Sequence, residues 1–598
     1  MHAEDDIAPT VLAEELDRIC ASLAFRHSHR HQRFLRHLID CKLHHRLSAL
    51  REVALGVEFF RRPPGSYDPK VDAVVRVEAG RLRRRLDRYY HGEGTAAPFE
   101  VILDRGSYLP SLRRRTVPAI ATGAQPSVAV LPVPPSTSQP ADAGAAVTLT
   151  DEIVRTLSRL PQIRVFGPES SLAAGVATDA GEARDRWNVT WIVRGTWSRD
   201  EPRDLVLEIA GTAAEEPAIV KTIEALPDDP PTFHQRVRDE LLHGFAAILG
   251  IVGESGAPHG PVPATRDLAA FDLYQRARYL LKQRDPYLLP RAIEQLAAAV
   301  RIDPDFSAAW AELAEAHVRR RRLVFDPGER DPAAARRAAR RAIELDPHCA
   351  GAYATLAGLA YAADFDWSRA GDLFTQALIQ APRDLGVRSA YAAFLMYSAR
   401  FEEALREYDV IQALDPLDPA TRCHKGALHF YWRHYERAET LLTQSLELAP
   451  NDVYAQLLLA DTFAQAGRPD ESLEASRRLV EIAPDYANSQ VYVARALRML
   501  GREQEAASIM HSARARFGGH ISEYEEAMLH VAGNECASAL ECLERHALRK
   551  ANGAHCIAVD PTFVRLHADP RWPELLTRCG LPDFSARLAA ACAASGPV

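Results

Sequence analysis

The stretch Pro416–Pro450, PLDPATRCHKGALHFYWRHYERAETLLTQSLELAP, carries the pattern that decides the fold of the second half of the chain. Two helix-like segments are followed by an acidic or small residue and then a proline. The pattern occurs six times, with successive prolines 43 and 35 and then three times 34 residues apart. These prolines are Pro304, Pro347, Pro382, Pro416, Pro450 and Pro484. A period of about 34 residues predicts helical hairpins, each of which buries its apolar face by stacking on its neighbours.

Small residues recur at fixed places in this pattern, as expected where two helices cross closely. Twelve residues before the prolines stand Ala292, Ala335, Ala370, Ala404, Ala438 and Ser472. Five residues before them stand Ala299, Ala342, Ala377, Ile411, Ser445 and Leu479, so this position is less strict. Gly467 and Gly501 each lie seventeen residues after a proline, where the first helix of a pair should end in a tight turn. The proline itself stops the second helix.

With these positions, residues 266–518 resemble the tetratricopeptide repeat family, which implies an all-α solenoid that binds a protein or peptide partner in its groove. Residues 319–330 are predicted to be an insertion or a longer loop. After Pro484, Ala506 and Ala513 keep the small positions of a seventh, irregular unit. Residues 519–585 are expected to form an irregular helical repeat and a carboxy-terminal cap.

Length and composition indicate several soluble domains. The chain has 598 residues, of which 47% are apolar, and nine scattered cysteines without a Cys-x-x-Cys pair. No stretch reaches about 18 uninterrupted apolar residues, and the start is acidic rather than basic. We therefore expect a cytoplasmic protein with no membrane contact.

The net charge of -8 hides a basic segment near the amino terminus. Residues 26–115 contain about 20 Lys and Arg against about 10 Asp and Glu, which suggests a polyanionic partner. Within this segment, an apolar stripe recurs at helical spacing over 71–90. The stripe consists of Val75, Ala79, Leu82, Leu86 and Tyr89. The same rotation places Arg81, Arg84 and Arg88 on the opposite face.

Two helices are predicted upstream of this basic helix, and a β-hairpin downstream, where Phe99–Leu103 alternates like a strand and Tyr108 follows a turn. This order, with Arg81-Leu82-Arg83 and Gly106-Ser107-Tyr108, resembles the winged helix-turn-helix of OmpR/PhoB-type transcription factors. A closer resemblance is to a bacterial family that joins such a domain to TolB-like and tetratricopeptide regions. Residues 10–25 are expected to be helical, where OmpR/PhoB-type domains have a β-sheet.

This resemblance implies that residues 1–115 bind double-stranded DNA. Arg81, Arg84 and Arg88 would enter the major groove, where arginine pairs with guanine or grips phosphate. Three further arginines are expected to contact DNA: Arg105 from the wing, and Arg76 and Arg83 from the basic helix. Arg61 and Arg62 are expected to contact the phosphate backbone of the DNA. A solvated arginine face that pairs with the acidic domains is the plainer alternative. Both a monomer and a homodimer remain open.

After a linker at 116–126, residues 127–252 alternate strands and helices, which predicts a small α/β domain. Strands are expected at 127–132, 163–166, 190–197, 204–210 and 218–223, with helices at 149–160, 180–187 and 232–249 and a loop at 134–145. The run Ala129-Val130-Leu131-Pro132 with Asp151-Glu152-Ile153 resembles the TolB amino-terminal-like domain. Asp151, Glu152 and Glu208 could suggest a metal site, but a helix amino-terminal turn and an exposed strand face explain them better. The histidines at 27, 29, 31, 37, 44 and 45 likewise favour a polar helix flank over a metal site, so no cofactor is predicted.

The fold class is therefore multidomain α + α/β: a winged-helix-like domain, a small α/β domain and an all-α solenoid. Phosphate-loop, nucleophile-elbow, zinc-protease and kinase motifs are absent from the sequence, so we predict that the protein is not an enzyme. The first hypothesis is a one-chain transcriptional regulator whose central and repeat domains sense a protein or small ligand. The alternative is a non-catalytic scaffold or adaptor in a bacterial signalling complex. In related chains TolB-like domains occur together with adenylyl cyclase domains, and this association connects the alternative with cyclic nucleotides.

Overall fold

A computed structural model describes most of residues 16–594. Outside the described residues lie 1–15, 91–98, 115–125, 168–188, 199–203, 213–218, 249–264, 323–331 and 595–598, together with stretches of three residues or fewer. The predicted linker at 116–126 and helix at 180–187 fall almost wholly in these ranges. The chain divides into two compact units. The first contains Met1–Pro118 and the short segment Thr375–Gln380, and the second contains Ala119–Phe374 and Ala381–Val598.

The first unit has the predicted order of elements. Helices α2 (His29–Leu43) and α3 (Glu52–Ala54), which continues into a π-helical turn at Leu55–Phe59, precede α4 (Val74–Tyr90). Strands β1 (Phe99–Ile102) and β2 (Ser111–Arg114) then pair antiparallel. Upstream of α2, residues 18–20 are helical. The identity of this unit as a winged helix stays a prediction.

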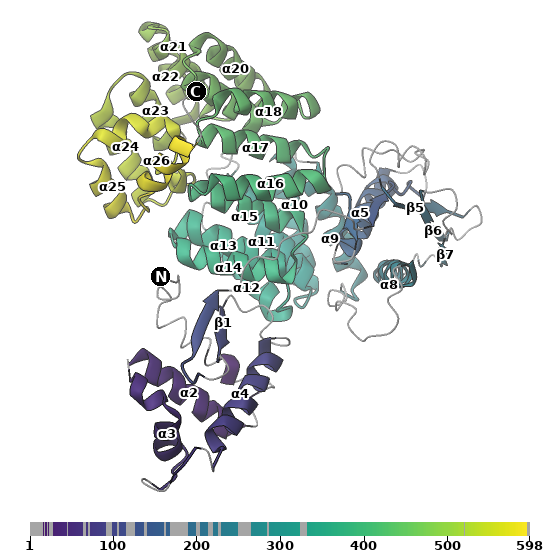
Figure 1. Cartoon of the computed structure of the whole chain (residues 1–598). Coiled ribbons are helices and arrows are strands. Elements are labelled where there is room, and N and C mark those ends of the chain that lie inside the picture. Colours follow the sequence, from purple (N-terminus) through teal and green to yellow (C-terminus); the bar gives the residue numbers. More distant parts are fainter. Residues whose placement is uncertain are drawn as a thin grey trace. The chain divides into compact units, whose positions relative to one another are not determined.

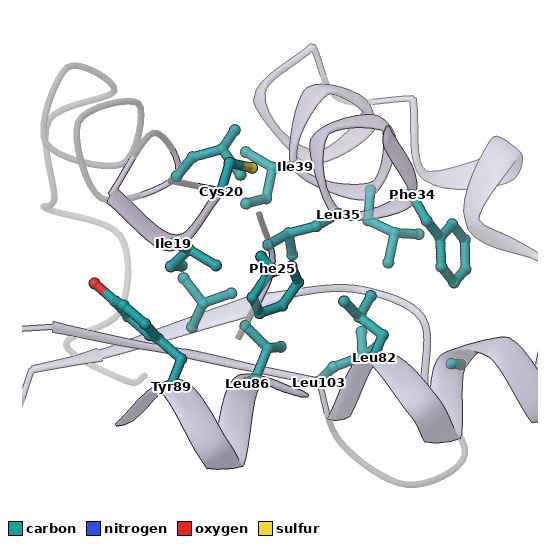
Figure 2. Packing of buried hydrophobic residues seen from close by; sticks show 14 of the residues in the cluster. Ile19, Cys20, Phe25, Phe34, Leu35, Ile39, Leu82, Leu86, Tyr89 and Leu103 are labelled. Atoms are coloured by element: carbon teal, nitrogen blue, oxygen red, sulfur yellow. The ribbon is translucent and has the colours of Figure 1, made fainter. Parts of the chain in front are cut away.

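The core of the first unit confirms the phase of α4. All five residues of the apolar stripe are at most 4% exposed, and they pack with Ile19, Phe25, Phe34 and Leu35 in one cluster (Figure 2). The next residue, Tyr90, is 3% exposed, and its hydroxyl accepts a hydrogen bond of 2.9 Å from the amide of Val101 in β1. Burial of one α4 face against α2 and the hairpin therefore leaves the opposite face toward solvent.

A five-stranded mixed sheet opens the second unit. Its strands are β3 (Ser127–Val130), β4 (Arg164–Val165), β5 (Trp191–Trp197), β6 (Leu205–Gly211) and β7 (Ile219–Ile223), in the order β4-β3-β5-β6-β7. β3 pairs parallel with β4 and β5, and the remaining pairs are antiparallel. Helices α5 (Pro140–Leu157) and α8 (Pro230–Ile248) contribute to its core. Identity with the TolB-like domain stays a prediction.

The start of α5 corrects the predicted helix at 149–160 and loop at 134–145. The helix begins at Pro140 because proline is tolerated in the first turn of a helix and the alanine-rich run after it favours helix.

Helical hairpins follow one another in sequence order from α9 to α24 (Figure 1). The described pairs are α9 (Leu268–Lys282) with α10 (Leu289–Ile302), α11 (Ser307–Arg322) with α12 (Ala333–Leu345), α13 (Ala350–Leu359) with α14 (Trp367–Gln380), α15 (Leu385–Tyr397) with α16 (Phe401–Leu414), α17 (Pro419–Tyr431) with α18 (Tyr435–Leu448), α19 (Val453–Gln465) with α20 (Pro469–Ile482), α21 (Ser489–Met499) with α22 (Glu503–Phe517), and α23 (Glu523–Ala532) with α24 (Cys536–Leu548).

The repeat positions behave as their chemistry predicts. All twelve residues of the two small positions are at most 3% exposed. Two residues after three of the prolines, Asp384, Asp418 and Asp452 cap the first helix of the next pair by accepting hydrogen bonds from its first amides. Beyond Pro484 the array is more regular than predicted, because α21 with α22 and α23 with α24 both form complete hairpins. The first residues of the expected insertion at 319–330 belong to α11, which is longer than the first helices of the other hairpins.

Short helices follow the last hairpin. They are 3₁₀ turns at Ala554–Cys556 and Pro561–Ala568, then α25 (Trp572–Cys579) and α26 (Ser585–Ala594), which extends beyond the predicted end of the cap at 585.

Candidate interaction surfaces

The exposed face of α4 carries part of the predicted DNA-binding set. Arg81 and Arg84 are exposed, and Val77 between the arginines is 47% exposed. Arg76, on the same helix, pairs with Glu52 at 3.1 Å. The structure therefore brings Arg76, Arg81 and Arg84 onto the solvent side of one helix, while the Arg88 side chain lies outside the described residues.

Arg83 has a different environment from its neighbours. Its guanidinium donates to the carbonyl oxygens of Leu103 at 2.6 Å and Ser107 at 3.0 Å, which ties α4 to the chain that follows β1. Arg62 pairs with Asp72 at 2.7 Å, and Arg61 is exposed with φ of 54°. Arg105 lies outside the described residues. The DNA-binding role of all eight arginines stays a prediction.

Glu78 is a residue of this region that the sequence reasoning missed. It is 4% exposed, and its carboxylate lies 2.8 Å from Arg81 and 3.1 Å from His31 of α2. Burial lowers the pKa of His31, against the opposing effect of Glu78. Glu78 stands three residues after Val75 and therefore borders the apolar stripe. A charged residue at this buried helical position was the sequence signal that could have identified it.

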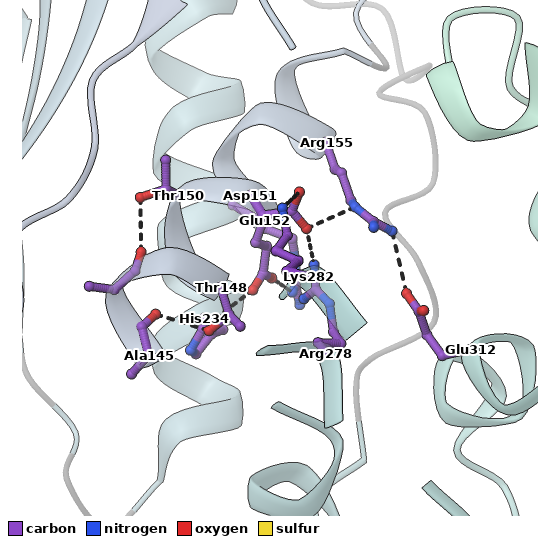
Figure 3. Close-up of polar contacts among 12 residues, drawn as sticks. Ala145, Thr148, Thr150, Asp151, Glu152, Arg155, His234, Arg278, Lys282 and Glu312 are labelled. Atoms are coloured by element: carbon purple, nitrogen blue, oxygen red, sulfur yellow. Dashed lines mark hydrogen bonds and ion pairs between the residues drawn. The ribbon is translucent and has the colours of Figure 1, made fainter. Parts of the chain in front are cut away.

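Buried charges join α5 of the α/β domain to α9 of the first hairpin. The side chain of Asp151 is 1% exposed and pairs with Arg278, with Lys282 at 2.7 Å and with Arg155 at 3.0 Å (Figure 3). Arg155 continues to Glu312 of α11 at 3.5 Å. Burial alone would raise the pKa of Asp151, but these cations outweigh it and hold the pKa well below its usual range.

Glu152 forms a second buried centre beside the first. Its carboxylate accepts from His234 at 2.5 Å and pairs with Arg238, both on α8. Burial would raise its pKa, but His234 and Arg238 lower it to about 2. The interpretation of Asp151 and Glu152 as a helix amino-terminal turn is wrong, because α5 begins at Pro140 and both residues lie well inside it.

Glu208 does lie on a strand, where it faces Arg194 across β5 and β6 at 3.5 Å. Among the described residues, no group of three His, Cys, Asp or Glu side chains is arranged to hold a metal ion. In the same part of the chain, no helix is both long and apolar enough to cross a membrane.

The first helices of successive hairpins, α11, α13, α15, α17, α19, α21 and α23, form one layer, since each contacts the next more closely than the second helices contact one another. The carboxyl ends of this layer contact the segment that follows the last hairpin. The ring of His555 packs 5.3 Å from Tyr361 and 4.9 Å from Tyr397, and Gln465 donates to the hydroxyl of Thr562 at 3.3 Å. The segment predicted as a terminal cap therefore lies along earlier repeats as well as on the last hairpin.

Helix α26 lies against the turns that follow the first helices, at three residues that we call the α26 seat: Trp367 at the start of α14, Ser398 and Trp432. The ring of Phe584, just before α26, packs edge-on against Trp367 at 5.2 Å. Arg587 donates to the carbonyl oxygen of Ser398, the residue that ends α15, at 3.2 Å. The indole of Trp432 donates to the carbonyl oxygen of Ala591 at 3.3 Å.

A buried acidic cluster lies where the last hairpins meet the carboxy-terminal segment. Asp461, Glu525 and Asp560 are each at most 9% exposed, and Arg495, at 2%, pairs with Asp461. Burial raises the pKa of Asp461 to about 7, although Arg495 opposes the shift, and burial also raises the pKa of the other two carboxyls. Burial in this cluster therefore disfavours the charged form of all three carboxyls.

The chain was compared with protein families, curated proteins and solved structures. A tetratricopeptide repeat family model matches residues 425–487. No curated protein matches the chain. Similar solved structures include pilF of Pseudomonas aeruginosa, with 21% identity over 36% of this chain and 92% of that chain and a TM-score of 0.28.

Others are a human IFIT1 dimer with m7Gppp-AAAA (15% identity, 60% of this chain and 80% of that chain, TM-score 0.40) and YrrB, a repeat protein with an unusual peptide-binding site (19% identity, 32% and 93%, TM-score 0.22). The family match contains all of α18, α19 and α20 and the second half of α17, whose caps and small positions repeat through the array. The carboxy-terminal region of this chain therefore contains tetratricopeptide repeats.

Proposed function

We propose that the protein is a non-catalytic interaction scaffold whose repeat array binds a protein or peptide partner. The observation that carries this proposal is that the carboxyl ends of the first helices, with the turns after them, hold a segment from elsewhere in the chain. Aromatic rings contact His555 and Phe584 there, and polar side chains contact Thr562 and Ala591. A surface with this mixture of rings and hydrogen-bonding groups suits short peptide segments.

The buried charges at α5 and α9 support a scaffold with two joined modules. Asp151 accepts from cations of the first hairpin, so the α/β domain and the repeats share an interior. Breaking such a pair leaves a buried charge without its partner, which is costly. A connection with cyclic-nucleotide signalling stays a prediction from resemblance alone.

Site-specific photocrosslinking in the source cell tests the scaffold. A photoreactive residue replaces Tyr454, which is 39% exposed on the first-layer helix α19, or Glu474, which is exposed on the second-layer helix α20. We expect one defined adduct from position 454 and none from position 474, and the captured protein should bind the purified chain. Equal, heterogeneous labelling from both positions would contradict a specific partner surface.

DNA binding by the first unit is the second candidate function. The observation that favours it is the solvent face of α4, where Arg84 is exposed and makes no ion pair with a described residue, next to Arg81 and Val77. Arginine and an exposed apolar side chain on one helix face match the edges of bases in a major groove. Together with the hairpin after α4, this face motivates a regulator in which a scaffold partner changes DNA occupancy.

A further inference from the structure

The α26 seat is an interaction surface that a helix of another protein could fill only if α26 left it. α26 has ten residues, of which Leu588 and Ala591 are buried, and Phe584 just before the helix is buried as well; all three are at most 7% exposed. Their spacing of four and then three residues makes one apolar stripe, while Ser585, Ala586, Ala589 and Ala590 are exposed. In the described part, residues 584–591, the segment therefore meets the array through a single narrow face.

Two hydrogen bonds between a side chain and the backbone hold α26 on the seat. Arg587 donates to Ser398 at the end of α15, where the helix dipole favours a cation, and Trp432 donates to Ala591. Helices shorter than about 12 residues are marginal in water on their own. Removal of α26 would interrupt no other described helix, because it is the last one.

We propose that α26 is a replaceable intramolecular ligand, and that the seat binds a partner's amphipathic helix with the same chemistry. That partner helix carries an aromatic residue, an arginine three positions later, leucine at the fourth and a small residue at the seventh. The aromatic residue packs on Trp367, the arginine reaches the carbonyl of Ser398, and the small residue allows Trp432 to approach the backbone. This proposal rests on the proposed scaffold function and names the class of partner.

The vacated seat would expose a large aromatic surface. Trp432 is 8% exposed with α26 in place and stacks near His429, His434 and Phe401, with centroids 4.7–6.0 Å apart. An exposed aromatic patch of this kind is unfavourable in water. When no partner is bound, α26 therefore covers the seat. α26 has a high effective concentration at the seat because it is part of the same chain. A partner helix must bind well enough to compete with it.

A labelled synthetic peptide of residues 580–598 is the probe. It is titrated against the full chain, against full-length Phe584→Ala/Leu588→Ala and against full-length Ala589→Ser, which changes an exposed position of the same helix. We expect at least tenfold tighter binding to the double variant than to the wild-type chain or the Ala589→Ser control. Adding Trp432→Ala to the double variant should remove that gain. Equal affinity for all chains, or binding that ignores Trp432→Ala, would overturn the proposal.

Hydrogen exchange of the unmodified chain provides a second reading that needs no variant to fold. The amides of α26 should exchange at least tenfold faster than those of α17, because α26 opens while the seat stays folded. Equal protection of both helices would overturn the replaceable ligand. A wild-type dimer that disappears in the double variant would also overturn it, since the seat would then hold α26 of a second copy.

The two proposals fail separately. Peptide binding to the double variant without a specific crosslink from position 454 would retain the seat and remove the scaffold. A specific crosslink with no peptide binding would retain the scaffold and remove the replaceable α26.

Discussion

Ala399 and Gly467 hold the same left-handed backbone conformation at equivalent turns of two repeats, with φ of 55° and 73°. In both turns the amide of the following arginine bonds at 2.9 Å to a carbonyl five residues earlier, in Arg400 to Leu395 and Arg468 to Phe463. Gly501 repeats the conformation, as do the non-glycine residues Phe365 and Arg433. The turn is thus a property of the repeat, and glycine is the residue that adopts it without strain.

Ala399→Gly should stabilise the array by about 0.5–1 kcal/mol, because relief of left-handed strain exceeds the extra entropy that glycine brings to the unfolded chain. Gly467→Ala should destabilise it by about 1 kcal/mol. A Cβ on Gly467 meets no atom within 4 Å, so its cost is purely conformational. Urea denaturation of the full chain measures both, and shifts of the same sign would contradict the shared-turn account.

The buried charge at the junction gives a second prediction. Asp151→Asn should cost about 3–5 kcal/mol of local stability, because Arg278 and Lys282 lose their buried counter-charge. Hydrogen exchange of α5 and α9 should rise together, while that of α24 stays unchanged. The matched control is Asp272→Asn on α9, whose carboxylate is 54% exposed and pairs with the exposed Arg276.

The same junction predicts acid sensitivity. The pKa of Glu152 is depressed to about 2, and that of Asp151 is held below its usual range. Depressed folded pKa values give stability that is present above the unfolded values near 4 and is lost as pH falls through the folded ones. Exchange at α5 and α9 should therefore accelerate from about pH 4 to pH 2, and Asp151→Asn/Glu152→Gln should flatten that dependence. An unchanged slope in the double variant would place the titration elsewhere.

At the acidic cluster, Asp461 predicts a pH dependence of stability opposite to that of the junction: stability falls as pH rises. Its pKa is raised to about 7, so its contribution to stability is complete below the unfolded value near 4 and is lost as pH rises through 7. The unfolding free energy of Asp461→Asn minus that of the wild type should rise by roughly 4 kcal/mol between pH 4 and pH 8. Glu474→Gln, at an exposed position of α20, is the control. Parallel pH profiles of Asp461→Asn and wild type would contradict the shift.

The repeat array was the most predictable part of the fold. The prolines and the small crossing residues act locally and recur at a nearly fixed interval, so the sequence shows them directly. The stripe of α4 was predictable for the same reason, since Val75 to Tyr89 need only helical spacing. The start of α5 was missed because an alanine-rich run after Pro140 resembles a loop in composition.

The contacts between modules could not be predicted. Asp151 finds Arg278 far along the chain, and the sequence contains no periodic signal for that pairing. α26 reaches the backbone carbonyl of Ser398 and the indole of Trp432, groups whose positions depend on the folded array. Arg83 illustrates the limit inside one helix: its neighbours Arg81 and Arg84 are exposed, yet its guanidinium bonds to the carbonyls of Leu103 and Ser107.

Arg83 and Arg84 separate folding from DNA binding in the first unit. Arg84→Ala should leave stability within about 0.5 kcal/mol of wild type, because the side chain is exposed. If the second candidate function holds, it should weaken binding of the full chain to duplex DNA and reduce the salt dependence of that binding by about one charge. Arg83→Ala should instead destabilise the unit by about 1–3 kcal/mol through the loss of two hydrogen bonds to carbonyls.

A salt series of duplex binding by wild type, Arg84→Ala and Arg83→Lys, each as the full chain, measures both effects. Arg83→Lys keeps the positive charge while removing the planar group that reaches two carbonyls, so it tests the hairpin contact without changing net charge. Binding that falls with salt in the wild type and weakens in Arg84→Ala would support a DNA interface on α4. Salt-independent binding, or equal binding by wild type and Arg84→Ala, would leave the arginine face as a solvated surface and the scaffold as the function of the whole chain.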